Sequence, residues 1–183
     1  MNINDLTIEQ YDIFTELVEQ SDIIGVFQLF GIDISDMSIA EMNTKFKEIT
    51  SFSYEQRKLN KYYMINGVKY KAQLQLSKIK AGQFIDFQSY MSGSKKLEQI
   101  LSIFLIPMKR KYGFWSEQKY GDYDVVKTQS EIKKYFTIAD AKTLSDFFLN
   151  LSVRLSETLR DCLVKRKYQM EKKMKKKSQK IVG

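Results

Sequence analysis

Apolar and polar residues alternate with a period of two in the segment after Lys61. One face collects Val68, Tyr70, Ala72, Leu74 and Leu76, and the other collects Lys69, Lys71, Gln73 and Gln75. This alternation is typical of a half-buried strand. Asn66 and Gly67 precede it and suit a two-residue type I′ turn, because both central residues of that turn need positive φ. The pattern predicts a β-hairpin that turns at Asn66 and Gly67 and places Ile65 opposite Val68.

The other apolar residues recur mostly at helical spacing. Two Ser/Thr-x-x-Glu/Gln capping boxes open helices at Thr7 and Ser38. Gly31 is suited to end a short helix, and Pro107 is expected to stop another. Helices are predicted near residues 8–18, 23–30, 39–49, 82–91, 95–106, 130–136 and 138–177. The expected fold is therefore α+β and mainly α-helical, with a small β-hairpin packed on helices and a long basic C-terminal helix.

Three parts are expected along the chain. Residues 1–50 form an acidic helical subdomain, and residues 51–137 hold the β-hairpin, helices and an aromatic loop at 108–127. Residues 138–183 form the long helix and its basic tail. If this helix is continuous to Lys177, it measures roughly 60 Å at about 1.5 Å per residue. An apolar stripe from Leu144 to Cys162 is expected to pack on the domain or on another helix.

Charge is separated along the chain. Residues 1–50 carry two Lys or Arg against ten Asp or Glu, a net −8. Residues 51–159 carry +8, and residues 160–183 carry another +8. The acidic part is either the solvated face of a helical subdomain or a docking face for a basic partner. The acidic and basic parts either pack together within one subunit or favour a head-to-tail contact between two copies.

Composition excludes several kinds of chemistry. The chain has no histidine and one cysteine, so His-based catalysis, His-metal sites, Cys-rich zinc sites and an intrachain disulfide are excluded. The glycines form no phosphate-binding motif. The longest apolar run, residues 103–107, is much shorter than a membrane span. We expect a soluble protein made in a reducing cytoplasm, with no catalytic residues, no metal, no cofactor and no membrane contact.

Two groups of residues are candidates for binding a partner. The aromatic loop offers Tyr112, Trp115, Tyr120 and Tyr123 among cations. Such a composition is typical of protein contact or local packing, and the alternative is stacking with single-stranded nucleic acid. Asp122 and Asp124 nearby are interpreted as solvated turn residues. The tail offers contacts to nucleic acid or to an acidic partner through Lys165, Arg166, Lys167, Lys172, Lys173, Lys175, Lys176 and Lys177.

Five short strings occur in an order that resembles a known group of viral proteins. They are KYYMINGVKY at residues 61–70, GQFIDF at 82–87, FLIP at 104–107, YGDYD at 120–124 and FFLNLS at 147–152. Over about residues 5–155 the chain resembles small tail- or neck-region proteins of tailed bacteriophages, including crAss-like phages of gut Bacteroidota. Some relatives resemble tail-assembly chaperones. The resemblance implies a role in the virion or in its assembly and no catalytic residues.

The leading hypothesis is a non-enzymatic virion protein, made in the bacterial host cytoplasm and located near the portal and tail or carried as cargo in the particle. Its expected partners are the portal, a tail ring or the tail tube. Further expected contacts are copies of itself on such a template and DNA through the C-terminal tail. One alternative is a tail-assembly chaperone absent from the mature virion. Another is a basic nucleic-acid-binding protein that acts through residues 160–180.

Overall fold

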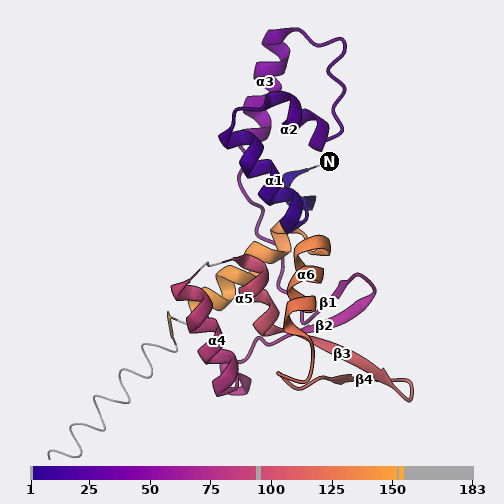
Figure 1. The fold of residues 1–183 in the computed structure, drawn as a ribbon, viewed down its shortest axis with the longest axis vertical. Coiled ribbons are helices and arrows are strands. Elements are labelled where there is room, and N and C mark those ends of the chain that lie inside the picture. Colours follow the sequence, from indigo (N-terminus) through magenta and orange to yellow (C-terminus); the bar gives the residue numbers. More distant parts are fainter. Residues whose placement is uncertain (1, 94–95, 152, 155–183) are drawn as a thin grey trace, which may run out of the picture. The chain divides into compact units, whose positions relative to one another are not determined.

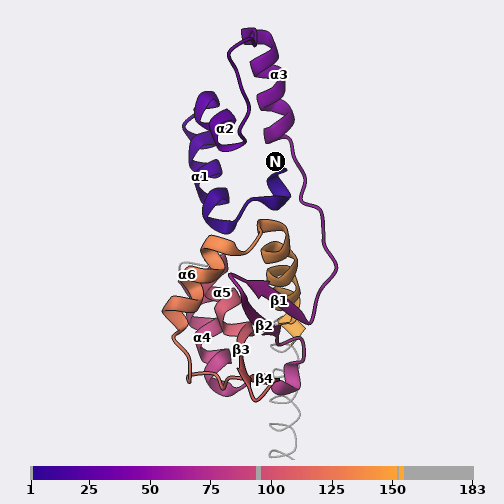
Figure 2. The same ribbon diagram turned by 90° about the vertical axis from the view of Figure 1, so that its right-hand side faces the viewer.

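The computed structural model describes residues 2–93, 96–151 and 153–154 (Figures 1 and 2). The chain divides into two compact units, unit 1 at residues 1–145 and unit 2 at residues 146–183. The fold is α+β and mainly α-helical, as the sequence pattern predicts. The domain boundaries expected at residues 50 and 137 stay predictions. The elements of unit 1, in chain order, are η1 (Ile3–Asp5), α1 (Ile8–Glu19), α2 (Ile23–Leu29), α3 (Ile39–Thr50), β1 (Tyr62–Ile65), β2 (Val68–Ala72), η2 (Leu76–Lys78), α4 (Ala81–Ser92), α5 (Leu97–Phe104), β3 (Leu105–Lys111), β4 (Phe114–Glu117) and α6 (Val125–Tyr135).

The N-terminal helices begin at the residues that the capping boxes predict. The Thr7 hydroxyl accepts a hydrogen bond from the Gln10 backbone N–H at 3.2 Å, and the Gln10 side chain accepts one from Thr7 N–H. Ser38 and Glu41 repeat this arrangement at the start of α3. Such reciprocal bonds satisfy two N–H groups that a helix start leaves without a partner. After α2, Gly31 takes a φ of +66°, as a C-terminal glycine does.

The predicted hairpin is present with its expected register. Ile65 pairs with Val68, and the two turn residues, Asn66 and Gly67, have φ of 46° and 73°. The hairpin is part of a larger sheet than the sequence suggested. Four antiparallel strands lie in the order β1-β2-β3-β4, so each strand neighbours the next along the chain.

The helix expected over residues 95–106 is present, but the strand that follows it was not predicted. The helix was expected to stop at Pro107, but α5 ends at Phe104, and Pro107 lies inside β3, opposite Tyr70 of β2. The Pro107 carbonyl accepts a hydrogen bond from Gln118 N–H at 3.2 Å. Proline has no backbone N–H, so it cannot donate a hydrogen bond to β4 in return. The hydrogen-bond ladder between β3 and β4 therefore ends beside Pro107, and β4 ends at Glu117.

The interpretation of residues 108–127 as one irregular loop was wrong. Its first part is the end of β3 and all of β4, and its last part begins α6 at Val125 rather than near residue 130. The Asp124 side chain accepts a hydrogen bond from Lys127 N–H at 2.9 Å, which caps this helix. Asp124 is therefore an N-cap residue as well as part of a turn.

One part of the core of unit 1 lies among the N-terminal helices α1 and α2, and another lies between the sheet and the helices α5 and α6. The sheet contributes Tyr63, Ile65, Tyr70 and Ala72, which are buried on one face. Tyr63 meets Phe136 edge-on, with ring centroids 5.2 Å apart, and Phe87 of α4 meets Phe104 of α5 at 5.5 Å. Gln83, buried in α4, donates a hydrogen bond to the Ile103 carbonyl at 2.8 Å. Burial of this apolar face stabilises a hairpin that is marginal when isolated.

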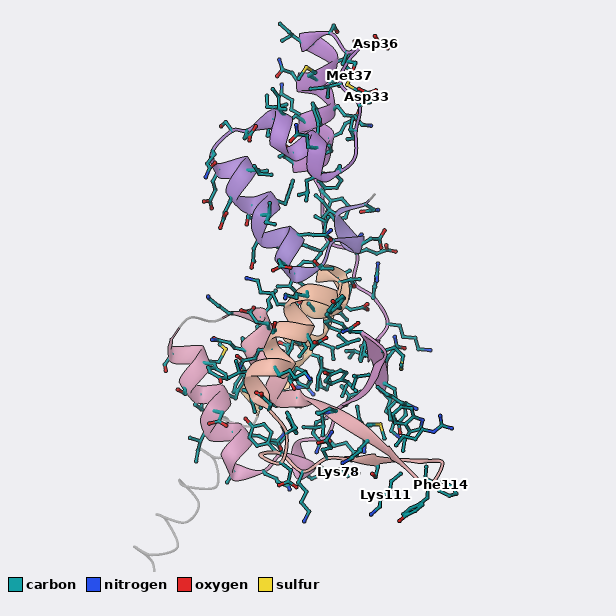
Figure 3. The ribbon with its side chains drawn as sticks, turned by 45° about the vertical axis from the view of Figure 1, so that its right-hand side comes forward. Asp33, Asp36, Met37, Lys78, Lys111 and Phe114 are labelled. Atoms are coloured by element: carbon teal, nitrogen blue, oxygen red, sulfur yellow. The ribbon has the colours of Figure 1, made fainter. Side chains whose placement is uncertain are left out.

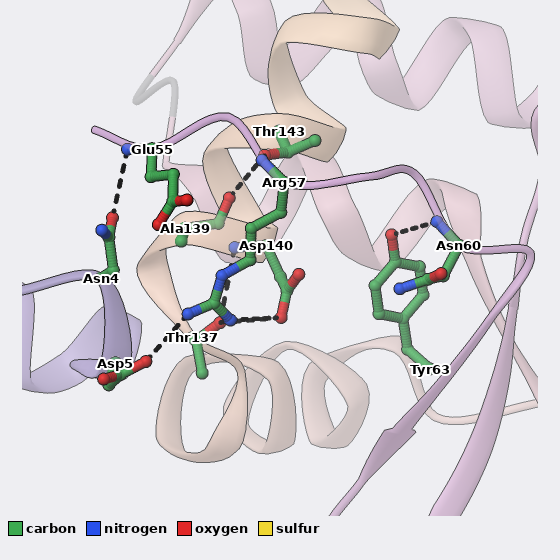
Figure 4. Close-up of polar contacts among 10 residues, drawn as sticks. All are labelled: Asn4, Asp5, Glu55, Arg57, Asn60, Tyr63, Thr137, Ala139, Asp140 and Thr143. Carbon is green, nitrogen blue, oxygen red and sulfur yellow. Dashed lines mark hydrogen bonds and ion pairs between the residues drawn. The ribbon is translucent and has the colours of Figure 1, made fainter.

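Arg57 ties three segments of unit 1 together (Figure 4). Its guanidinium donates to the carboxylate of Asp5 at 2.8 Å, to that of Asp140 at 3.3 Å and to the hydroxyl of Thr137 at 3.3 Å. Its backbone N–H donates to the Thr143 hydroxyl at 3.1 Å. The connection between α3 and β1 is thereby held against the N-terminal segment and the helix after α6. Sequence patterns did not indicate this network.

The N-terminal segment also pairs directly with the end of α6. Thr7 and Thr137 form an antiparallel bridge, in which Ile138 N–H donates to the Leu6 carbonyl at 2.7 Å. Residues 138–151 are helical, as predicted, and those up to 145 belong to unit 1. The part of the predicted long helix that holds Cys162 and the basic tail lies outside the described residues.

Candidate interaction surface

The hairpin formed by β3 and β4 turns on two residues with positive φ. Tyr112 has a φ of 50° and Gly113 a φ of 83°, and Lys111 pairs with Phe114 across them. The turn is thus closed by two residues in the same way as the turn at Asn66. Positive φ is uncommon for a tyrosine and readily adopted by glycine. The sequence hides this turn, because only its second residue is a typical turn residue.

Large rings and cations lie together at the tip of this hairpin. Tyr112 is 89% exposed and Phe114 80% exposed. The three residues that precede the turn, Lys109, Arg110 and Lys111, are all basic and exposed. We call these five residues the hairpin surface (Figure 3 labels Lys111 and Phe114). Rings that stay in water beside cations are typical of residues that a partner buries.

Trp115 lies beside the hairpin surface, on the sheet face that it shares with Arg110. The Lys69 ammonium is 4.4 Å from the ring centroid of Tyr62 and 5.5 Å from that of Trp115, so one cation joins β1 to β4. Arg110 is the register partner of Trp115. Such cation–π contacts contribute about 0.5–1 kcal/mol at exposed sites. Trp115 remains 41% exposed, so it helps to hold the sheet and still offers a ring to a partner.

Positive charge continues from the sheet face into a hollow beside β2. The hollow has a volume of about 280 Å³ and is lined in part by Lys61, Lys71 and Lys78. Lys71 is paired with Glu117 of β4, which reduces the net positive charge there. The hollow therefore extends the positively charged face of the sheet and is not a separate binding site.

Tyr120 and Tyr123, the other two aromatic candidates, point inward. The Tyr120 hydroxyl donates to the Asp86 carboxylate of α4 at 2.6 Å, and the Tyr123 hydroxyl donates to the Ser102 carbonyl of α5 at 3.3 Å. Burial raises the pKa of both tyrosines above the ordinary value of 10.0, and Asp86 raises that of Tyr120 further. These tyrosines fasten the segment before α6 to the helices. The structure therefore separates the predicted set into Tyr112 and Trp115, which face solvent, and Tyr120 and Tyr123, which do not.

Phe114 belongs to the site and was not among the predicted residues. The sequence signal for Phe114 was Gly113, which is a typical turn residue. The residue that follows a two-residue turn pairs with the residue that precedes the turn. The candidates from Lys165 to Lys177 lie outside the described residues.

Within the described ranges, no three His, Cys, Asp or Glu side chains gather as a group that could hold a metal ion. Among the residues that the structure describes, no helix combines the length and apolar character needed to cross a membrane. No protein-family model, curated protein or solved structure matches this chain.

Proposed function

We propose that this chain is a non-enzymatic protein of a tailed-bacteriophage particle that binds a structural protein of the portal or tail region through the hairpin surface. The observation that carries the binding role is the exposure of Tyr112, the first residue of a defined two-residue turn, and of Phe114, the residue that follows the turn. The similarity of the five sequence strings to phage tail- and neck-region proteins supports the setting.

The chemistry of the hairpin surface indicates what it binds. Rings supply contact area at a low cost in conformational entropy, and the flanking cations select an acidic surface. A two-residue turn between paired strands fixes the rings relative to the cations, so little order has to be gained on binding. An acidic protein surface with apolar depressions has the matching chemistry.

The test compares two variants in particles of the phage that encodes the chain. The first variant carries Tyr112→Ser and Phe114→Ser, and the control carries Val126→Ser, which removes an exposed apolar side chain from α6. We expect the wild-type chain in purified particles by mass spectrometry. We expect the control at the same level and the first variant strongly depleted, with unchanged circular dichroism of the purified proteins.

Two results overturn this proposal. If the wild-type chain is bound to assembly intermediates but absent from purified particles, the chain is an assembly chaperone instead. If the hairpin variant enters particles as well as the control does, the hairpin surface is not the binding site.

A further inference from the structure

A second surface lies on α3, at the acidic end of unit 1. Helix α3, which lies wholly within the described part of the chain, has no buried residue. Its apolar positions Met42, Phe46 and Ile49 are only half-buried, and Ile39 is 79% exposed. A helix with an apolar stripe is usually stabilised by packing that stripe against a neighbour. Helix α3 therefore keeps apolar surface that another molecule can cover.

Hollows flank α3 on two sides. The larger has a volume of about 440 Å³ and is lined by Met37 and Ala40 together with the polar residues Glu41, Thr44, Lys45 and Glu48. A second hollow, of about 290 Å³, shares Lys45 and Glu48 and has mainly apolar walls. The larger hollow is thus an open depression along one side of α3, where Met37 and Ala40 lie among exposed polar side chains and Lys45 pairs with Glu48 at 3.1 Å.

Negative charge surrounds the larger hollow. Asp33 and Asp36 lie in the connection that leads into α3 and are labelled beside Met37 in Figure 3. Hydrogen bonds from Ser35 hold the pKa of Asp33 below its ordinary value, and hydrogen bonds from Ser38 do the same for Glu41. These carboxylates are therefore charged at neutral pH. We call Asp33, Asp36, Met37, Ala40, Glu41 and Glu48 the α3 surface.

The α3 surface and the hairpin surface complement each other in two respects. One offers Met37 and Ala40 among carboxylates, and the other offers two exposed rings with three flanking cations. Both belong to unit 1, where Figure 3 draws them at opposite ends, so one copy does not bring its own two surfaces together.

We infer that the hairpin surface of one copy docks on the α3 surface of a second copy, with a ring of the hairpin tip in the hollow beside Met37. This inference rests on the proposed function, because it adds a second copy of the chain to the partners of the same hairpin. Two different patches meet, so the contact is heterologous and leaves a free hairpin and a free α3 surface at the two ends of a pair. Further copies add in the same way.

Such a contact is weak in free solution. Complementary charge speeds encounter more than it raises affinity, and its effect falls with ionic strength. Free copies are therefore expected to associate only at low salt and high concentration, and ordered assemblies are expected on a particle that aligns the copies.

The experiment is a charge exchange with the full-length chain, followed by sedimentation velocity at low and at high salt. One variant carries Asp33→Lys, Asp36→Lys and Glu48→Lys, so both of its surfaces are basic. The other carries Lys109→Glu and Lys111→Glu, so both are acidic. The control carries Glu19→Lys, an exposed charge reversal outside both surfaces. We expect each variant alone to lose association by about tenfold or more at low salt, and the control to keep it.

The equimolar mixture of the two variants decides between a specific contact and a general charge effect. In the mixture, each basic surface finds an acidic one with the same geometry, so association is expected to return at low salt. Monomeric wild-type chain at all concentrations, no recovery in the mixture, or oligomers that survive high salt and both reversals would each overturn the inference. If self-association fails while particle incorporation still needs Tyr112 and Phe114, the proposed function stands and only this inference falls.

Discussion

Replacing Arg57 by methionine removes the charged bridge between the N-terminal segment and the helix after α6 while keeping an unbranched apolar stem. The pair with Asp5 is short, at 2.8 Å, but the Asp5 side chain is 59% exposed. Exposed pairs contribute about 0.2–1 kcal/mol. The pair with Asp140 is better shielded, with a side chain 21% exposed. A charged hydrogen bond there contributes up to about 1.5 kcal/mol after allowing for solvent.

These contributions give a loss of about 2 kcal/mol in the free energy of unfolding for Arg57→Met. For a chain of this size, that corresponds to a fall of about 4–8 °C in Tm. The backbone bond from Arg57 N–H to Thr143 is unaffected by the substitution, so the connecting segment keeps one anchor.

The assay is urea unfolding followed by circular dichroism, with a double-mutant cycle that adds Asp5→Asn. Because Asp5 is the more exposed partner, we expect a coupling energy below about 1 kcal/mol. Lys133→Met is the matched control, since Lys133 makes a single exposed pair with Asp12 at 2.8 Å. If Arg57→Met costs no more than Lys133→Met, the Arg57 network is worth no more than one surface ion pair and this reasoning is wrong.

Three further predictions concern the turn, the two inward-pointing tyrosines and the tail. Gly67→Val is expected to lower the free energy of unfolding by about 1–3 kcal/mol, because φ is 73° at this position. Gly82→Ala in α4 is the control: the added Cβ meets open space, so this change is expected to raise the free energy of unfolding by about 0.5 kcal/mol in the same thermal scans. The raised pKa values of Tyr120 and Tyr123 mean that the unfolded chain releases these protons near pH 10.0 and the folded chain only above it. The free energy of unfolding is therefore expected to be unchanged below pH 10.0 and to fall as pH rises further. Tyrosinate absorbance from these two residues is expected to appear together with unfolding. Deprotonation of all eleven tyrosines near pH 10.0 without unfolding would contradict this. In the basic tail, residues 165–177, Lys→Arg replacement is expected to preserve DNA or acidic-partner binding and Lys→Gln to weaken it with a strong salt dependence, and equal loss in both would indicate specific contacts.

Features that depend on neighbouring residues could be predicted from the sequence. The hairpin at Asn66 and the capping boxes at Thr7 and Ser38 are such features, because turn and cap chemistry is local. Strand β3 could not be predicted. Its apolar start continues the helical pattern of α5, its second half is basic throughout, and Pro107 normally argues against a strand. Its pairing with β2 is a tertiary contact that leaves no local signal.

The same distinction applies to the candidate surface. Composition indicated an aromatic and basic segment but did not show which rings face solvent. Tyr120 and Tyr123 are turned inward by Asp86 and Ser102, which lie on helices earlier in the chain. Phe114 is turned outward by a turn whose first residue is a tyrosine with positive φ. Contacts with residues distant in sequence, and the positive φ of the first turn residue, determine which rings are exposed. Amino-acid composition indicates neither of them.

The bridge between Thr7 and Thr137 has a consequence for synthesis on the ribosome. A nascent chain emerges N-terminus first, so residues 6–8 leave the exit tunnel long before residues 136–138 do. Until then, Leu6 and Ile8, both buried in the finished fold, have no strand to join. The contacts that complete the amino-terminal helices therefore form last, since closing so long a loop is slow. Chains truncated before Thr137 are expected to expose this segment, which makes them substrates for chaperones and proteases.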